Sequence, residues 1–174
     1  MLSSLEYRKS IVLINGQEYY CGQWSIGTEL CQNIAPQNPQ TFQLRNGRGI
    51  SVGTKLGDSK SSPTKELYEG FWYNNFPHGM GRQIYSNGTY YVGEFMAGIK
   101  EGNGKLVWQD GSEYEGSFKN NVFEGEGTYK WANLNYYQGT FRNGKMNGHG
   151  IFKWVDGRIY EGEFFNGSRH GKGR

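Results

Sequence analysis

One interval recurs through most of this chain: a tyrosine followed two places later by a glycine appears every 23 residues. The five pairs begin at Tyr68, Tyr91, Tyr114, Tyr137 and Tyr160. A period that does not vary is typical of a repeat protein, in which each unit buries its apolar face by stacking on its neighbours. The repeat therefore constrains the fold more than any other feature of the sequence.

Other residue types recur in the same register. The complete units have an aromatic residue at the fifth place, a Gly-x-Gly pair at the twelfth and fourteenth places, and an aromatic residue at the eighteenth. In the unit that begins at Tyr114, these residues are Phe118, Gly125 with Gly127, and Trp131. A turn pair such as Asn-Gly or Asp-Gly closes most units. The units span residues 68–90, 91–113, 114–136 and 137–159, with a truncated unit at 160–174.

The alternation of residue types within a unit predicts two β-strands. Side chains at the first, third and fifth places project from one face of a strand, and those at the fourteenth, sixteenth and eighteenth project from one face of a second strand. Glycine is unfavourable in a strand unless a neighbour approaches closely, so the glycines at the third place are expected to leave room for aromatic rings. The seventh to thirteenth places are predicted to form the hairpin loop, and the turn pair leads into the next unit. The predicted fold is all-β: an elongated, twisted, solenoid-like antiparallel sheet of stacked 23-residue β-hairpin repeats.

The pattern Tyr-x-Gly-x-(Phe/Trp)-x-x-Gly-x-x-x-Gly-x-Gly at this period resembles the MORN repeat family. The resemblance covers residues 68–174, and many positions match in register, which makes it far more specific than a single Gly-x-Gly. It implies the same elongated antiparallel sheet, with a groove along one face.

Residues 1–67 carry a degenerate version of the pattern. The segment YCGQW at 20–24 repeats the opening of a unit, and Gly-Arg-Gly at 47–49 repeats the glycine pair. The sequence between them is longer than one unit allows, which predicts an insertion at 28–45. A polar segment predicts a second insertion at 55–66.

No catalytic or ligand-binding constellation stands apart from the repeat. The three histidines, His78, His149 and His170, are separated by 71 and 21 residues and match no compact zinc motif. The two cysteines, Cys21 and Cys31, match none either. No glycine pair continues into a dinucleotide fingerprint or a P-loop. The sequence is therefore expected to encode no enzyme and to bind no metal or cofactor.

Composition narrows the class of partner. The net charge is only +3 and the aromatic residues stand at positions expected to be buried, so a nucleic-acid partner is not expected. The longest aliphatic run, residues 11–14, is far short of the ~20 residues that span a bilayer, and the N-terminus lacks the apolar stretch of a secretory signal. We expect an intracellular protein.

The function expected from the sequence is that of a non-catalytic structural or scaffold protein that binds other proteins, in a large assembly. Resemblance to short, enzyme-free MORN proteins implies a ciliary axoneme (a radial-spoke head or the central apparatus) or a cytoskeletal assembly. A regulatory domain acting in trans on an enzyme is a further possibility. The residues expected to contact partners are Trp72, Tyr85, Phe95, Trp108, Phe118, Trp131, Phe141, Trp154, Tyr160, Phe164, Phe165 and Arg169.

The alternative function is that of a membrane-surface adaptor that binds anionic phospholipids. Resemblance to other MORN arrays implies this membrane-binding function, and a basic cluster near the C-terminus favours it. Acidic residues interrupt this cluster, and no lipidation signal accompanies it. Its members are Arg142, Lys145, Lys153, Arg158, Arg169, Lys172 and Arg174.

The fifth unit stops just past its glycine pair, at Gly173 and Arg174. We expect the strand at 160–166 to have little or no pairing on its outer side. An exposed strand edge invites pairing with another chain. The sequence therefore predicts an interface at this end, filled by a partner strand or by another MORN protein in a continuing stack.

Overall fold

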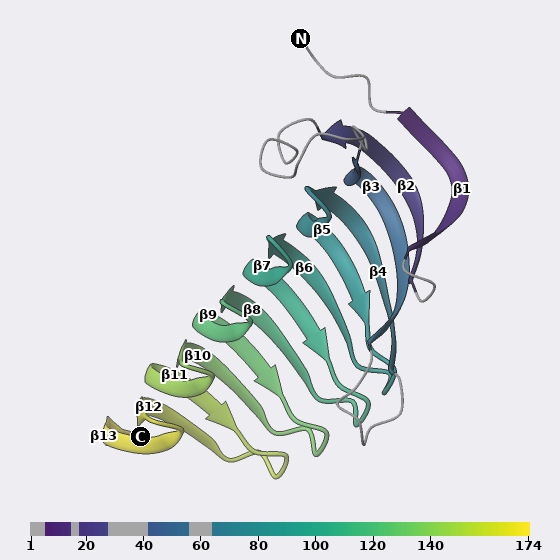
Figure 1. The fold of residues 1–174 in the computed structure, drawn as a ribbon. Helices are drawn as coiled ribbons and strands as arrows, with labels where there is room; N and C mark the ends of the chain where they lie inside the picture. Colours follow the sequence, from purple (N-terminus) through teal and green to yellow (C-terminus); the bar gives the residue numbers. More distant parts are fainter. Residues whose placement is uncertain (1–5, 15–17, 28–41, 56–63) are drawn as a thin grey trace.

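A computed structural model describes residues 6–14, 18–27, 42–55 and 64–174. These residues form one open antiparallel sheet of 13 strands, in which each strand pairs with the strands before and after it in the chain (Figure 1). The strands are β1 (Glu6–Ile14), β2 (Glu18–Gly27), β3 (Phe42–Lys55), β4 (Thr64–Tyr73), β5 (Phe76–Ile84), β6 (Tyr90–Met96), β7 (Ile99–Val107), β8 (Glu113–Lys119), β9 (Val122–Lys130), β10 (Tyr136–Arg142), β11 (Lys145–Lys153), β12 (Ile159–Phe165) and β13 (Ser168–Gly173). The all-β prediction of stacked hairpins is confirmed.

Each repeat is a hairpin closed by a two-residue turn. In the third repeat the turn residues Asn120 and Asn121 have φ angles of 50° and 66°. Positive φ at both positions is typical of the type I′ turn, whose twist matches the two strands that it joins. The predicted loop over the seventh to thirteenth places is wrong, because β9 already begins at Val122, the ninth place. Asparagine and glycine are frequent in this stretch because the turn and a bulge require them.

A second kind of turn joins one repeat to the next, as predicted. Its Asn or Asp side chain accepts a hydrogen bond from the backbone two residues later, for example Ser112 N–H to Asp110 Oδ1 at 2.8 Å. The residue between them has a positive φ, which glycine adopts without strain. It is Gly111 in this turn, whereas the next turn has Leu134 with a φ of 66°.

The core is a row of tyrosine rings lying over pairs of glycines. Tyr114 is fully buried, and its hydroxyl donates to the carbonyl of Ser117 at 2.8 Å. Gly116 lies directly opposite Gly127 on the next strand, and a Cβ atom on either glycine would clash with the tyrosine hydroxyl. Glycine is therefore required because the ring occupies the space above both backbones. The same arrangement recurs in all five repeats.

Edge-to-face contacts link successive repeats through this core. Tyr91 contacts Phe95 of its own repeat and Phe118 of the next, with ring centroids 5.0 Å apart in both pairs. This geometry places the positive ring edge against the negative ring face, which stabilises the pair beyond its buried area. Each repeat is therefore held by the ring of its neighbour, as expected of a stacked array.

The N-terminal strands extend the same register. Gly22 pairs with Gly49, and Gly49 pairs with Gly70, so the row of opposed glycines continues through β2 and β3. Of the two predicted insertions, residues 42–45 belong to β3. Lys55 ends that strand, and residues 64–66 begin β4. The remaining parts of both insertions lie outside the described residues.

The C-terminal end differs from the sequence prediction. Strand β12 does have a partner on its outer side, because β13 pairs Ser168 with Phe165 and Gly173 with Gly162. Two backbone hydrogen bonds between Glu161 and Arg174 extend this pairing. The expected lack of pairing along 160–166 is wrong, since the return strand begins at the ninth place and needs no residue beyond Arg174. Pairing of another chain at this end stays a prediction, and it concerns β13.

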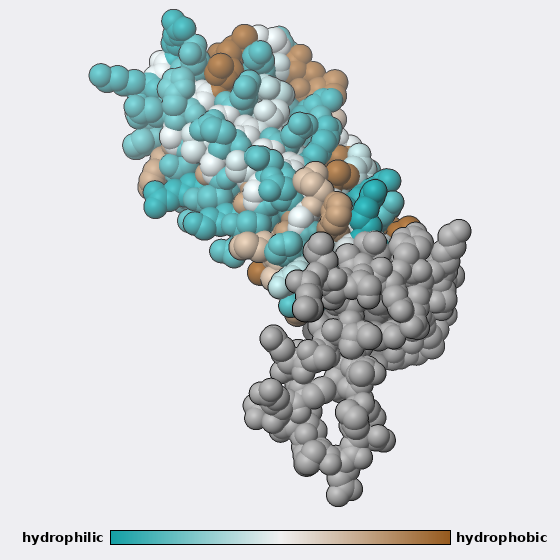
Figure 2. Space-filling model, turned by 90° about the horizontal axis from the view of Figure 1, so that it is seen from above, coloured by the Kyte–Doolittle hydropathy of each residue, from teal (hydrophilic) through white to brown (hydrophobic). Residues whose placement is uncertain are grey.

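The described surface is mainly hydrophilic, with hydrophobic residues gathered in small groups (Figure 2). No helix among the described residues is long and apolar enough to cross a membrane.

Candidate partner-binding surface

The aromatic residues at the fifth place form the core and present almost no surface. Their exposed fractions lie between 3% and 6%. Such rings hold the sheet together, and a partner reaches them only through the residues that cover them. They are Trp72, Phe95, Phe118, Phe141 and Phe164.

The aromatic residues at the eighteenth place are only partly buried, and three of them belong to a continuous line of rings. Trp108 contacts Tyr129, which contacts Trp131, with centroids 5.4 Å and 4.5 Å apart. Trp131 contacts Phe152 at 5.2 Å, and Phe152 contacts Trp154 at 4.6 Å. We call these five residues the aromatic row. Their accessible ring surfaces form an apolar strip along the second, third and fourth repeats.

Tyr85, at the eighteenth place of the first repeat, lies outside this row. Its hydroxyl donates to Gln83 Oε1 at 2.9 Å, and the Lys100 ammonium lies 5.4 Å from the centre of its ring. Burial raises the pKa of the Tyr85 hydroxyl to about 12. The row does not reach Tyr85, because the place that holds the linking rings Tyr129 and Phe152 in later repeats is occupied by Leu106 in the second repeat.

At the tenth place the sequence analysis identified only Arg169, because the residue type at this place changes from repeat to repeat. It pairs across the hairpin with the buried aromatic residue of the fifth place. In the second, third and fifth repeats it also contacts the tyrosine of its own repeat. Phe123 stacks on Tyr114 with centroids 3.9 Å apart and planes inclined by 16°. In the other repeats the place holds Pro77, Lys100, Met146 and Arg169. Its pairing with the fifth place across a two-residue turn is the only signal that could have identified the tenth place as a whole.

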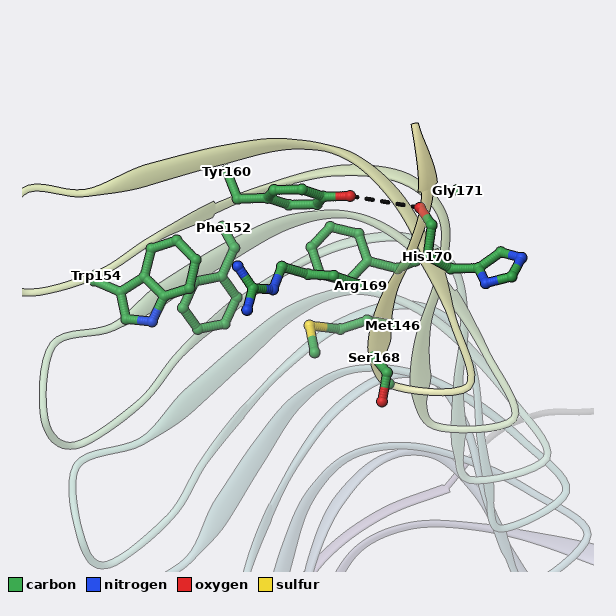
Figure 3. Close-up of a pocket in the computed structure, with 10 residues that line it drawn as sticks. Met146, Phe152, Trp154, Tyr160, Ser168, Arg169, His170 and Gly171 are labelled. Carbon is green, nitrogen blue, oxygen red and sulfur yellow. Dashed lines mark hydrogen bonds between the residues drawn. The ribbon is translucent and has the colours of Figure 1, made fainter. Parts of the chain in front are cut away.

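A pocket of about 780 Å³ opens at the C-terminal end of the aromatic row (Figure 3). The side chains of Met146, Trp154, Tyr160 and Arg169 lie on the inner side of the curve that β12 and β13 follow (Figure 3). The Arg169 guanidinium lies 5.6 Å from the ring centres of both Trp154 and Tyr160. This pocket combines apolar ring surface with one cation, and Arg169 forms no ion pair among the described residues.

Phe165 does not join these residues. It follows Phe164 directly in β12, and neighbouring residues of a strand point to opposite faces. Its ring is 62% exposed and contacts His170, which points away from the pocket (Figure 3). The twelve predicted contact residues thus divide into a buried core set, an inner set that is partly buried except for the exposed Arg169, and Phe165 on the other face.

Burial also raises the pKa values of the core tyrosine hydroxyls. It raises the pKa of the Tyr137 hydroxyl to about 12 and raises those of Tyr91 and Tyr114 still further. Ionising such a hydroxyl inside the sheet is unfavourable because the charge would lose its hydration. The perturbation follows from packing, and each hydroxyl already donates to a backbone carbonyl.

No group of three or more His, Cys, Asp or Glu side chains lies close enough to hold a metal ion in the part of the chain that the structure describes.

The MORN repeat model matches the chain at residues 68–90, 91–113, 114–136, 137–157 and 160–174, which is more than half of its length. The chain belongs to the MORN repeat family. The fourth match ends at residue 157, two residues before the predicted end of that repeat. A comparison with curated proteins finds no match. MORN repeats are generally non-catalytic and serve in binding or as scaffolds.

Proposed function

We propose that this MORN protein is a non-catalytic scaffold that binds another protein along the aromatic row. The continuous contact of five partly buried rings is the observation that carries the proposal. Aromatic side chains are enriched at protein interfaces because each contributes a large apolar area with few rotatable bonds. The assembly that we propose is intracellular, either a ciliary axoneme or the cytoskeleton, on the resemblance to short MORN proteins.

The pocket at Arg169 fits a segment of the partner that is mainly apolar and carries one hydrogen-bond acceptor. Apolar side chains would lie on the rings, and a carbonyl or carboxylate oxygen would accept from the guanidinium. The cation already lies over Trp154 and Tyr160, so little side-chain entropy is lost when a partner binds.

Membrane binding has less support from the arrangement of the basic cluster. Arg158 forms an ion pair with Asp156 and Arg174 forms one with Glu161. Arg169 lies on the inner face, whereas Arg142 and Lys145 lie at the hairpin end of the fourth repeat. A membrane surface would need these charges to face one way.

Recovery of partners from cell extracts tests the proposal. The tagged full chain is compared with a double variant, Trp131→Leu with Trp154→Leu, which keeps an apolar side chain at both sites and removes the ring surface. Val155→Ser with Ile159→Ser is the matched control, because both residues are at least 60% exposed and neither belongs to the row.

We expect the leucine variant to lose its partners, identified by mass spectrometry, by at least about tenfold. The serine variant should retain them, and both variants should melt within a few degrees of the native protein. Full partner recovery by a folded leucine variant would contradict the proposal. Sedimentation of the native protein with anionic vesicles, unaffected by the leucine changes, would favour the membrane alternative.

A further inference from the structure

The hairpin turns carry an inter-repeat contact that the sequence pattern did not reveal. The first turn residue donates its backbone N–H to a side chain of the preceding repeat, at the eleventh place. Asn120 donates to Glu101 Oε2 at 2.9 Å, and Asn143 donates to Glu124 Oε2 at 2.8 Å. In the two earlier turns the acceptors are Asn46 Oδ1 for Asn74 and His78 Nδ1 for Ala97. Four successive turns thus have an acceptor at the same place.

The last turn, between β12 and β13, lacks this acceptor. Asn147 stands at the eleventh place, and no hydrogen bond joins it to the N–H of Asn166. Within the described chain this N–H has no acceptor at all. Asn46, which is also an amide, accepts from the first of these turns, whereas Asn147 does not accept from the last one. The place beside the Asn166 N–H is therefore open to an external carboxylate.

A pair of like charges lies beside this turn. Arg142 and Lys145 stand directly opposite each other at the end of β10 and β11. Like charges in such a cross-strand pair destabilise the sheet unless an anion lies between them. Neither side chain forms an ion pair among the residues described. The corresponding pairs in the three earlier repeats are Tyr73 with Phe76, Met96 with Ile99, and Lys119 with Val122.

These groups line one open niche of about 530 Å³. It offers the two cations, amide groups and the exposed ring of Phe165, and it contains no carboxylate. The carboxylate of Glu124, at the eleventh place of the preceding repeat, already accepts from the Asn143 N–H. The lining residues are Arg142, Asn143, Lys145, Asn147, Phe165 and Asn166.

We propose that this niche binds the carboxylate of an Asp or Glu side chain on a protein partner. The carboxylate takes the place that Glu101 and Glu124 occupy in the earlier turns, accepts from Asn166 N–H and neutralises the like-charged pair. The exposed Phe165 ring provides an apolar contact for the residue next to the acid. Because Phe165 lies on the face opposite the aromatic row, this site is independent of the proposed function.

The backbone favours a carboxylate over a phosphate. Phosphate sites commonly present several successive free N–H groups. Here the next N–H, that of Gly167, already donates to the carbonyl of Met146 at 2.9 Å. One free N–H and two cations in one niche match a carboxylate, which is the group that accepts from the corresponding N–H of Asn120 and Asn143.

The test uses the ¹⁵N-labelled full chain and a synthetic peptide, acetyl-Glu-Glu-Leu-Glu-Glu-amide, as the probe. Asn147→Glu supplies the carboxylate from within the chain, and Asn147→Gln is the matched control that keeps a neutral amide. We expect the peptide to shift the Asn166 amide resonance of the native protein. Asn147→Glu should weaken peptide binding at least about tenfold, whereas Asn147→Gln should leave it within about twofold.

A second readout does not depend on the peptide. Asn147→Glu should melt at a higher temperature than Asn147→Gln, because the internal carboxylate satisfies Asn166 and the two cations. The proposal is overturned if the peptide leaves the Asn166 resonance unchanged, if Asn147→Glu binds the peptide as tightly as the native chain does, or if it melts below Asn147→Gln. It is equally overturned if a phosphoserine peptide or anionic vesicles bind the niche at least about tenfold more tightly than the acidic peptide.

Discussion

Replacing Gly116 by alanine tests whether close packing of the tyrosine over the glycine pair holds the sheet together. The new Cβ would lie 2.5 Å from Gly127 Cα, 2.6 Å from the carbonyl oxygen of Glu126 and 2.8 Å from the Tyr114 hydroxyl. Carbon atoms in contact prefer about 3.5–4.0 Å, so a neighbour must move by about 1 Å. The backbone of β9 is held by ladders on both sides, and the tyrosine is fully buried.

The cost follows from these contacts. Overpacking of a tight interior costs about 1–3 kcal/mol, and loss of the hydrogen bond from Tyr114 to Ser117 adds about 1 kcal/mol. We expect Gly116→Ala to lower the free energy of unfolding by roughly 2–4 kcal/mol. Guanidinium titration followed by circular dichroism measures this value, and an unchanged slope shows that the midpoint shift reports stability.

Gly111→Ala is the matched control, because no atom lies within 4 Å of the Cβ that it adds. Its φ of 85° still disfavours alanine, at a cost of about 1 kcal/mol. If Gly116→Ala costs no more than Gly111→Ala, the close-approach argument fails.

Two further predictions concern stability. Leu134→Gly should raise the free energy of unfolding by up to about 1 kcal/mol, because the exposed leucine has a φ of 66°; a melting temperature at or below that of the native protein would contradict this. The protein should also lose stability at alkaline pH, because the raised pKa values of Tyr91, Tyr114 and Tyr137 keep these hydroxyls neutral in the folded state. Below about pH 10, the usual pKa of tyrosine in an unfolded chain, these hydroxyls are neutral in both states and stability is fully retained. Above it, each tyrosine that ionises only on unfolding lowers the free energy of unfolding by up to about 1.4 kcal/mol per pH unit. Denaturant titrations at several pH values measure the decline, which Tyr137→Phe should make shallower, and a flat profile would refute it.

The repeat architecture was predictable because its signals are local and repeated. A tyrosine, a glycine and an aromatic residue at alternate places predict one face of a strand, and the 23-residue period predicts stacking. The sequence also predicted that glycine makes room for a ring. It did not show that the ring covers a glycine on each of two strands, because that pairing depends on the hairpin register.

The hairpin register was the main error of the sequence prediction. A stretch such as NNVFEGEG, residues 120–127, contains enough asparagine and glycine to predict a long loop. The structure uses Asn120 and Asn121 for a two-residue turn and Gly125, with a φ of 89°, for a bulge within β9. A loop and a short turn followed by a bulged strand have similar compositions, so composition alone does not separate them.

Packing between repeats also explains why many of the residues predicted to contact a partner belong to the core. Places with a nearly constant residue type, such as the buried fifth place, are constant because every repeat must pack against the next in the same way. Places that vary are free of that demand. The tenth place changes from Phe123 to Met146 to Arg169, and the eleventh changes from Glu124 to Asn147. In an array of equivalent units, a partner distinguishes one repeat from another only through such variable places. The surface at Arg169 and the niche at Asn147 both lie where the last two repeats depart from the earlier ones, so this end of the array carries the chemical information that a specific partner requires.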